Sequence, residues 1–137
     1  PLSYDFNNDV LYDASIGKSK NIKTFIMDST VVVGVGNIYA SESLFLAGIS
    51  PKRVSGKTSK NRYQTLTHSI KKILTDAINN GGTTLNDFSN VDGSPGYFSQ
   101  VLCVYDREDM PCIRCNGKIK RIVQNQRATY YCPKCQN

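Results

Sequence analysis

The chain has 137 residues, a formal net charge of +6 and a pI near 9.1. This length allows one modest hydrophobic core and excludes a large multidomain body. No signal peptide and no apolar run of membrane-spanning length is recognisable, which argues against a secreted or membrane-spanning protein. Two stretches, between Glu42 and Asp76 and from Pro111 to Asn137, carry basic residues and no acid. They predict a polyanion partner, most simply a phosphate backbone, although a solvated helix face explains Lys71 and Lys72 better.

The first half of the chain has helical patterns. After an extended entry (1–8), a short helix is expected through about Ile16, followed by a break at Gly17. The apolar spacing of the next segment predicts an amphipathic helix from Lys18 to Asp28 with Lys18, Lys20 and Lys23 on its solvent side. A buried turn over 29–34 leads to a helix from Asn37 to Ala47, which ends at Gly48.

The second half changes character. Ser59 is expected to open a long helix with one apolar stripe, closed by Gly81 and Gly82; the stripe comprises Leu66, Ile70, Ile73, Leu74 and Ile78. A polar loop (83–96) and a strand (97–105) should precede a terminal β-hairpin. The predicted fold is therefore mainly α with a small β zinc finger, divided into a helical domain (1–82), a loop (83–98) and a finger (99–137).

The finger prediction rests on four cysteines in the pattern C-x₂-C-x₁₆-C-x₂-C: Cys112, Cys115, Cys132 and Cys135. Each short pair can aim two thiolates at one centre, and the spacer suits a hairpin that brings the pairs together. Four thiolates in this spacing favour one structural Zn²⁺. Disulfides or a redox pair remain alternatives, but nothing indicates secretion and no βαβ pattern is present. Cys103 lies in an apolar run and is expected to pack in a core.

A second motif joins two of the predicted helices: Val-Gly-Val-Gly-Asn-Ile-Tyr-Ala, residues 33–40. Its glycines permit close backbone approach, and the helix starting at Asn37 offers unpaired N–H groups to an anion. Alone, a Gly-x-Gly turn fits ordinary packing better than a phosphate site.

The order of motifs adds a resemblance. VVVGVGNIYASESLF, GISPKR, GGTTLNDF, DGSPGYF and the four-cysteine pattern resemble the bacterial formamidopyrimidine-DNA glycosylases, which excise 8-oxoguanine and formamidopyrimidines and act as AP lyases. The stretches correspond to the family's helix–two-turn–helix domain and its zinc finger. The GNIYASE and PGYF stretches fit this family better than the related endonuclease VIII. The resemblance implies double-stranded damaged DNA as partner, one structural Zn²⁺, a monomer, and a bacterial cytoplasm.

The resemblance also assigns residues. It implies DNA contacts by Lys18, Lys23, Gly36, Asn37 and Arg127, and it makes Arg127 a proton donor in δ-elimination. The clamp role suits Arg127 better, because a guanidinium rarely loses its proton. The family's loop over the everted base would correspond to 82–98. His68 matches no motif and is expected to face solvent or to be capped.

The family's catalytic groups are expected to be absent from this chain. Its nucleophile is an N-terminal proline followed by a glutamate on a separate β-sandwich domain, whereas this chain begins Pro1-Leu2-Ser3. The chain therefore resembles the C-terminal half of the enzyme and is expected to bind DNA without excising a base. A rival interpretation is a non-enzymatic nucleic-acid-binding zinc module, which would have no use for the GGTTL and PGYF loop.

Overall fold

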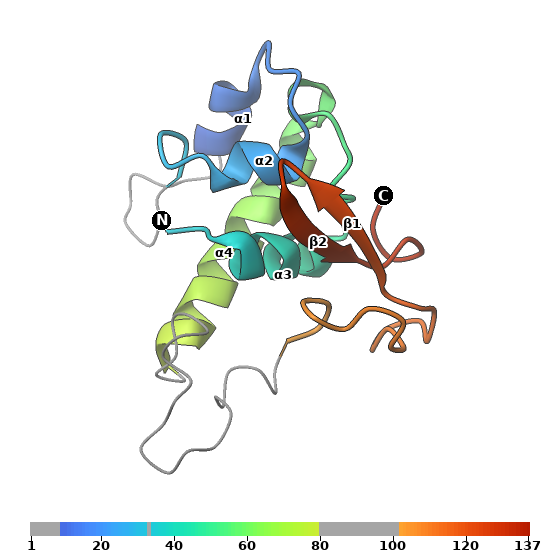
Figure 1. Cartoon of the computed structure of the whole chain (residues 1–137). Coiled ribbons are helices and arrows are strands. Elements are labelled where there is room, and N and C mark those ends of the chain that lie inside the picture. Colours follow the sequence, from blue (N-terminus) through green and yellow to red (C-terminus); the bar gives the residue numbers. More distant parts are fainter. Residues whose placement is uncertain (1–8, 33, 80–101) are drawn as a thin grey trace.

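The computed structural model describes residues 9–32, 34–79 and 102–137. Four α-helices and one antiparallel hairpin make up its regular structure (Figure 1), in agreement with the predicted mainly α fold. The elements are α1 (Val10–Ser15), α2 (Ile22–Met27), α3 (Asn37–Ala47), the 3₁₀ turn η1 (Ser55–Lys57), α4 (Lys60–Asn79), β1 (Lys120–Gln124) and β2 (Arg127–Tyr131). In the described parts of the chain, no helix is long and apolar enough to span a membrane.

The core of the helical body forms around the first half of α4. Tyr63 is fully buried there, with its ring edge-on to Phe25 of α2 at 6.0 Å and to Tyr12 of α1 at 6.3 Å. Leu66 and Ile70, one and two turns further on, are also fully buried. Aromatic edge contacts and burial of this kind are the main source of stability in a helical domain of this size. The predicted apolar stripe of α4 is thus confirmed for these residues.

Helix α2 begins later than its apolar spacing indicated. The Asn21 side chain accepts a hydrogen bond from the Thr24 N–H at 2.8 Å, so Asn21 is the N-cap and Lys18 and Lys20 precede the helix. Lys23 departs further from the prediction, because its side chain is 1% exposed rather than on the solvent side. Helical spacing puts it opposite the α2 core face, but a second element covers that face.

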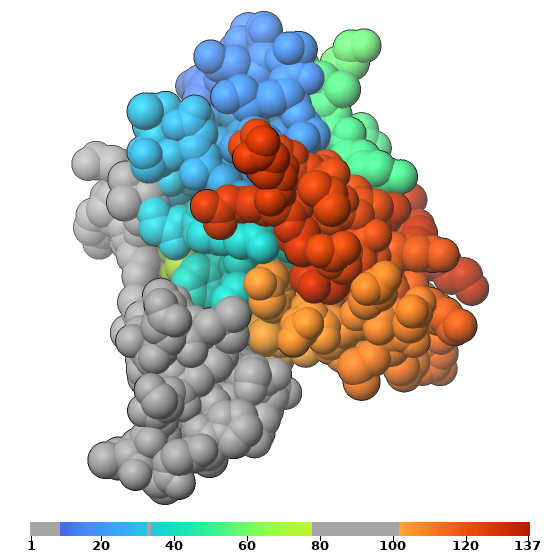
Figure 2. Space-filling view, viewed as in Figure 1, coloured from blue at the N-terminus to red at the C-terminus, as the bar shows by residue number. Residues whose placement is uncertain are grey.

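The covering element is the β-hairpin. Figure 2 shows residues 120–131 lying across the surface made by α2 and α3, and β2 is the strand that contacts α3. The hairpin closes through Asn125 and Gln126, both with positive φ (49° and 65°), as the two-residue type I′ turn requires. The helical body and the finger therefore form one packed unit.

The expected strand over 97–105 is wrong for its described part. Residues 102–105 adopt no strand, and 97–101 lie outside the described residues. The N–H groups of Cys103, Val104 and Tyr105 donate to the carboxylate of Glu42 at 2.7, 2.8 and 2.9 Å. A side chain has taken the hydrogen bonds that a neighbouring strand would otherwise supply. The expected loop over 83–98 also lies outside the described residues.

Candidate metal centre and nucleic-acid interface

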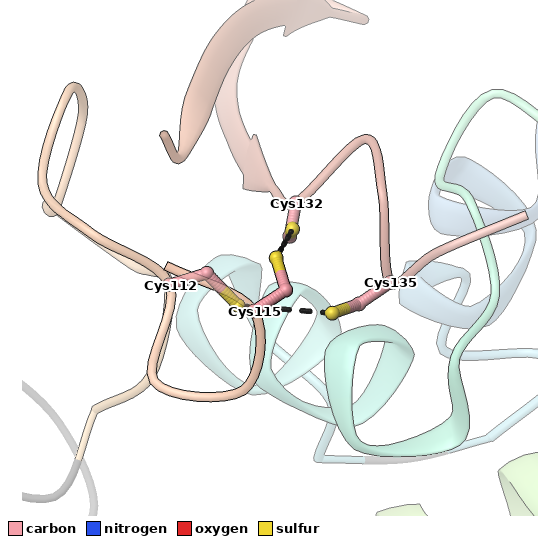
Figure 3. A group of neighbouring side chains, drawn as sticks. All are labelled: Cys112, Cys115, Cys132 and Cys135. Atoms are coloured by element: carbon pink, nitrogen blue, oxygen red, sulfur yellow. Dashed lines mark hydrogen bonds between the residues drawn. The ribbon is translucent and has the colours of Figure 1, made fainter. Parts of the chain in front are cut away.

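The four predicted cysteine ligands meet at one centre (Figure 3), with all four Sγ atoms within 4.8 Å of one another. Cys112 Sγ lies 3.8 Å from Cys135 Sγ, and Cys115 Sγ lies 3.5 Å from Cys132 Sγ. A tetrahedral zinc site with bonds of about 2.3 Å places its sulfurs about 3.8 Å apart. The cluster is therefore able to hold one zinc ion, as the spacing predicted.

Backbone donors support the thiolates. The Arg114 N–H points at Cys112 Sγ and the Gly117 N–H at Cys115 Sγ, each at 3.4 Å. Such bonds favour the charged sulfur that a metal requires. With four protein ligands the site leaves no open position for a reacting water, so its role is structural.

The finger is attached to the helical body at several points beyond the cysteines. Gln136 accepts from the Cys132 N–H at 2.8 Å and donates to the Ile49 carbonyl at 2.9 Å, linking a metal ligand to the end of α3. Arg114 stacks on the Phe45 ring at 4.5 Å, and Gln124 donates to the Pro51 carbonyl at 3.0 Å. The position of the hairpin is thus set by contacts at both of its ends.

Three predicted DNA-contact residues, Lys23, Asn37 and Arg127, come together at the start of β2, next to the hairpin turn. The Lys23 ammonium of α2 donates to the Asn37 side-chain oxygen, to Thr129 Oγ1 at 2.7 Å and to the Ala128 carbonyl at 3.2 Å. Asn37 in turn donates its amide to the same Ala128 carbonyl at 3.0 Å. We call Lys23, Asn37, Ala128 and Thr129 the Lys23 cluster. It lies directly beside Arg127, the first residue of β2.

A cleft of about 320 Å³ opens between α2 and the hairpin turn. Lys20, Lys23 and Arg127 line it with three positive charges, against one acid, Asp28. Lys20 lies 3.7 Å from Asp28, while the exposed Arg127 side chain has no hydrogen-bond or ion-pair partner among the residues described. A guanidinium left unpaired at the mouth of a cationic cleft is suited to bind an anion.

The two remaining predicted contacts differ in position. Gly36 is exposed at the N-terminus of α3, where no side chain caps the helix and an added Cβ would meet nothing within 4 Å. An anion could therefore approach this helix end closely. Lys18 is also exposed but does not line the cleft; its backbone carbonyl accepts from the Gly56 N–H at 2.9 Å. His68 is exposed on α4, as expected.

Burial and like charge both act on Lys23. Desolvation, and then the nearby Arg127 charge, lower the pKa of Lys23 from 10.5 to about 8. The folded protein therefore holds this proton less tightly than the unfolded chain does.

A pH dependence follows from that difference. Between pH 8 and 10.5 the unfolded state binds more protons at Lys23, so this residue makes the free energy of unfolding rise with pH across the window. Urea unfolding of the wild type and of Lys23→Met at pH 7, 8, 9 and 10 isolates the effect as the difference between their slopes. Parallel pH profiles for the two proteins would contradict it.

Glu42 is a residue that the sequence motifs left without a role. It is 3% exposed, and burial raises the pKa of its carboxyl while the three N–H bonds from residues 103–105 favour the charged form. Burial, and then the charge of Glu42, raise the pKa of the Cys103 thiol to about 11, and Cys103 packs against the finger core as expected. The sequence does contain a signal for this role, because Glu42 is the single charged residue in the otherwise uncharged helix from Asn37 to Ala47.

Two family models match the chain. Residues 1–89 match the formamidopyrimidine-DNA glycosylase H2TH domain, and residues 111–137 match the zinc finger found in FPG and IleRS. The formamidopyrimidine-DNA glycosylases of Ruthia magnifica and Idiomarina loihiensis are 62% and 55% identical to it over 136 residues. These alignments cover 99% of this chain and 51% and 50% of the relatives. The chain thus spans about half the length of the curated relatives it matches.

Solved structures agree with the sequence matches. The crystal structure of MutM (Fpg) from Thermus thermophilus superposes with a TM-score of 0.89 at 36% identity, over 99% of this chain and 52% of that one. The Lactococcus lactis Fpg in complex with DNA containing an abasic site gives a TM-score of 0.87 at 32% identity, over 99% and 49%. Helical domain, finger and four-cysteine cluster all correspond, and this chain belongs to the formamidopyrimidine-DNA glycosylase family.

Proposed function

We propose that this chain is the DNA-binding part of a base-excision-repair glycosylase and AP lyase that removes 8-oxoguanine and formamidopyrimidines. The observation that carries the proposal is the Arg127 guanidinium at the cationic cleft, which has no partner in the described part of the chain and lies beside the uncapped start of α3. Both features are suited to DNA phosphates. The named relatives and the Lactococcus lactis complex with abasic DNA support the same partner.

The proposed contacts hold a bent backbone. An enzyme that excises a base must first rotate its nucleotide out of the duplex, at a cost of a few kcal/mol. In our proposal Arg127 and the N-terminus of α3, with Gly36 and Asn37, bind the phosphates next to the lesion and stabilise that everted state. Lys18 adds a contact outside the cleft. The family resemblance adds Lys23 as a phosphate ligand and Arg127 as proton donor, but the guanidinium is better suited to a clamp.

The chemistry of the whole enzyme is part of the proposal as well. In the family, the amine of an N-terminal proline attacks C1′, the base leaves, and β- and δ-elimination cut the strand. No residue of this chain is proposed as that nucleophile, so the 137 residues by themselves should bind DNA without excision. We propose that they bind as a monomer. The bacterial relatives favour action on nucleoid DNA in the cytoplasm.

Binding to a duplex with a tetrahydrofuran abasic analogue, beside an undamaged duplex, tests the proposal. We expect the zinc-loaded chain to prefer the abasic duplex, and Arg127→Ala to weaken that binding by about 10- to 150-fold, the range for a lost charged hydrogen bond. Arg121→Ala is the matched control, since Arg121 is an exposed arginine on β1 that does not line the cleft.

Two results would contradict the proposal. Equal affinity for both duplexes, with equal losses from the two arginine variants, would favour a general nucleic-acid-binding module. A borohydride-trapped adduct with a true abasic site would show that an amine of this chain is itself catalytic.

A further inference from the structure

The Lys23 ammonium has no donor left for a ligand in this structure. A protonated lysine offers three N–H groups, and those of Lys23 have three acceptors within the protein: Asn37 Oδ1, Thr129 Oγ1 and the Ala128 carbonyl. Its side chain is 1% exposed. Lys20 lines the same cleft, is well exposed and makes no such bonds to the hairpin. Lys23 is therefore bonded to the hairpin, whereas Lys20 is exposed to a ligand in the cleft.

The hairpin register explains why the Ala128 carbonyl is available. Gln124 and Arg127 close the two-residue turn, so they form a hydrogen-bonded pair. The next pair, Val123 and Ala128, alternates with it, and its backbone groups point away from the partner strand. On β2 this outer edge faces the helical body, where Lys23 and Asn37 bond the Ala128 carbonyl. Two side chains thus occupy the place of a third strand.

The hydrogen bonds from Lys23 and Asn37 to β2 are accepted by Ala128 and Thr129, the two residues that follow Arg127. A shift or rotation of β2 would break the Ala128 and Thr129 contacts together, so the Lys23 cluster fixes the hairpin orientation where the arginine leaves it. Resting on the proposed function, we infer that Lys23 is a positioning residue for DNA binding: it holds β2 so that Arg127 meets a phosphate. In this one respect the inference departs from the family resemblance, because Lys23 makes no phosphate contact itself.

The salt dependence of binding distinguishes a Lys23 that positions Arg127 from a Lys23 that contacts a phosphate itself. Affinity falls as salt rises, and each phosphate contact adds about 0.9 to the magnitude of the slope of log K against log salt on duplex DNA. Arg127→Ala should reduce the magnitude of this slope by about one for the abasic duplex. Lys23→Met should weaken binding about tenfold and reduce the magnitude of the slope by a similar amount, because Arg127 no longer meets its phosphate. In the Arg127→Ala background it should add little further loss of affinity and no further change in slope, because both variants remove one function.

Thr129 supplies a variant that alters no charge. Thr129→Val removes one acceptor of the Lys23 ammonium and should weaken binding several-fold, but by little in the Arg127→Ala background, whereas Thr129→Ser keeps the hydroxyl and should bind like the wild type. Lys20→Met is the matched lysine control, with no expected coupling to Arg127. Zinc content and thermal unfolding show that each variant is folded.

The inference is overturned if, in the Arg127→Ala background, Lys23→Met reduces the magnitude of the slope by about one more and its loss of affinity adds fully, or if Thr129→Val binds as well as Thr129→Ser. Failure of the proposed function has a different signature. In that case the wild type would not prefer the abasic duplex, and Arg127→Ala itself would have no effect.

Discussion

Cys132→Ser is expected to abolish zinc retention, lowering the zinc content from one ion per chain to near zero. Removing one of four thiolates opens the coordination shell, and structural zinc contributes apparent free energies of about 10–16 kcal/mol in finger peptides. Cys132 directly follows β2, so the hairpin and the Lys23 cluster should be lost with the metal. Zinc analysis of the purified protein and the chemical shifts of residues 120–131 measure both effects.

The fifth cysteine provides the control. Cys103→Ser removes a thiol outside the cluster and should retain one zinc per chain. The helical body of the Cys132→Ser protein should keep its α-helical circular dichroism, because its core around Tyr63 lies in the helices. Full zinc occupancy in Cys132→Ser, or equal zinc loss in Cys103→Ser, would contradict the assignment of the site.

Glu42→Ala is expected to lower the free energy of unfolding by about 3–5 kcal/mol. The substitution leaves the N–H groups of residues 103–105 without their acceptor, and an unpaired buried donor costs about 1–3 kcal/mol. The cavity left by the side chain adds to that cost. Urea unfolding of the zinc-loaded protein measures the change.

Glu108→Ala is the matched control, since Glu108 is an exposed acid in the same region. It should change the free energy of unfolding by less than about 0.5 kcal/mol. A loss in Glu42→Ala no larger than in Glu108→Ala would mean that the carboxylate does not hold residues 103–105 in solution.

The sequence predicted those features that depend on local pattern. Cysteine spacing predicted the metal cluster, because two short pairs can converge on one tetrahedral centre. Apolar spacing predicted the buried residues Leu66 and Ile70 of α4, and Gly48 predicted the end of α3, where it adopts the left-handed conformation at φ 74°. These features require no knowledge of how distant segments pack.

The errors have a common cause, which is contact between distant segments. Helical spacing puts Lys23 on the solvent side because nothing in α2 itself indicates that the hairpin covers it, more than a hundred residues later. Apolar content predicts a strand over residues 102–105, but Glu42 takes its backbone donors. In both places a buried charged side chain contacts a segment distant in the sequence, which the local pattern does not reveal.

The same contacts show how the fold prepares a binding site. The zinc cluster shapes the finger, Glu42 and Gln136 attach it to α3, and the Lys23 cluster aligns β2 on α2. Arg127 is left exposed beside the uncapped start of α3. Arg127 and the N-terminus of α3 therefore form the proposed DNA-binding surface.

Chemical-shift mapping by NMR of the zinc-loaded chain, free and with the abasic duplex, locates the DNA-binding surface. We expect the largest changes on the Arg127 side-chain N–H and on the amides of Gly36 and Asn37, with little change at exposed residues of α4 such as Lys72. Changes centred on α4, with Arg127 and Gly36 unaffected, would contradict this expectation.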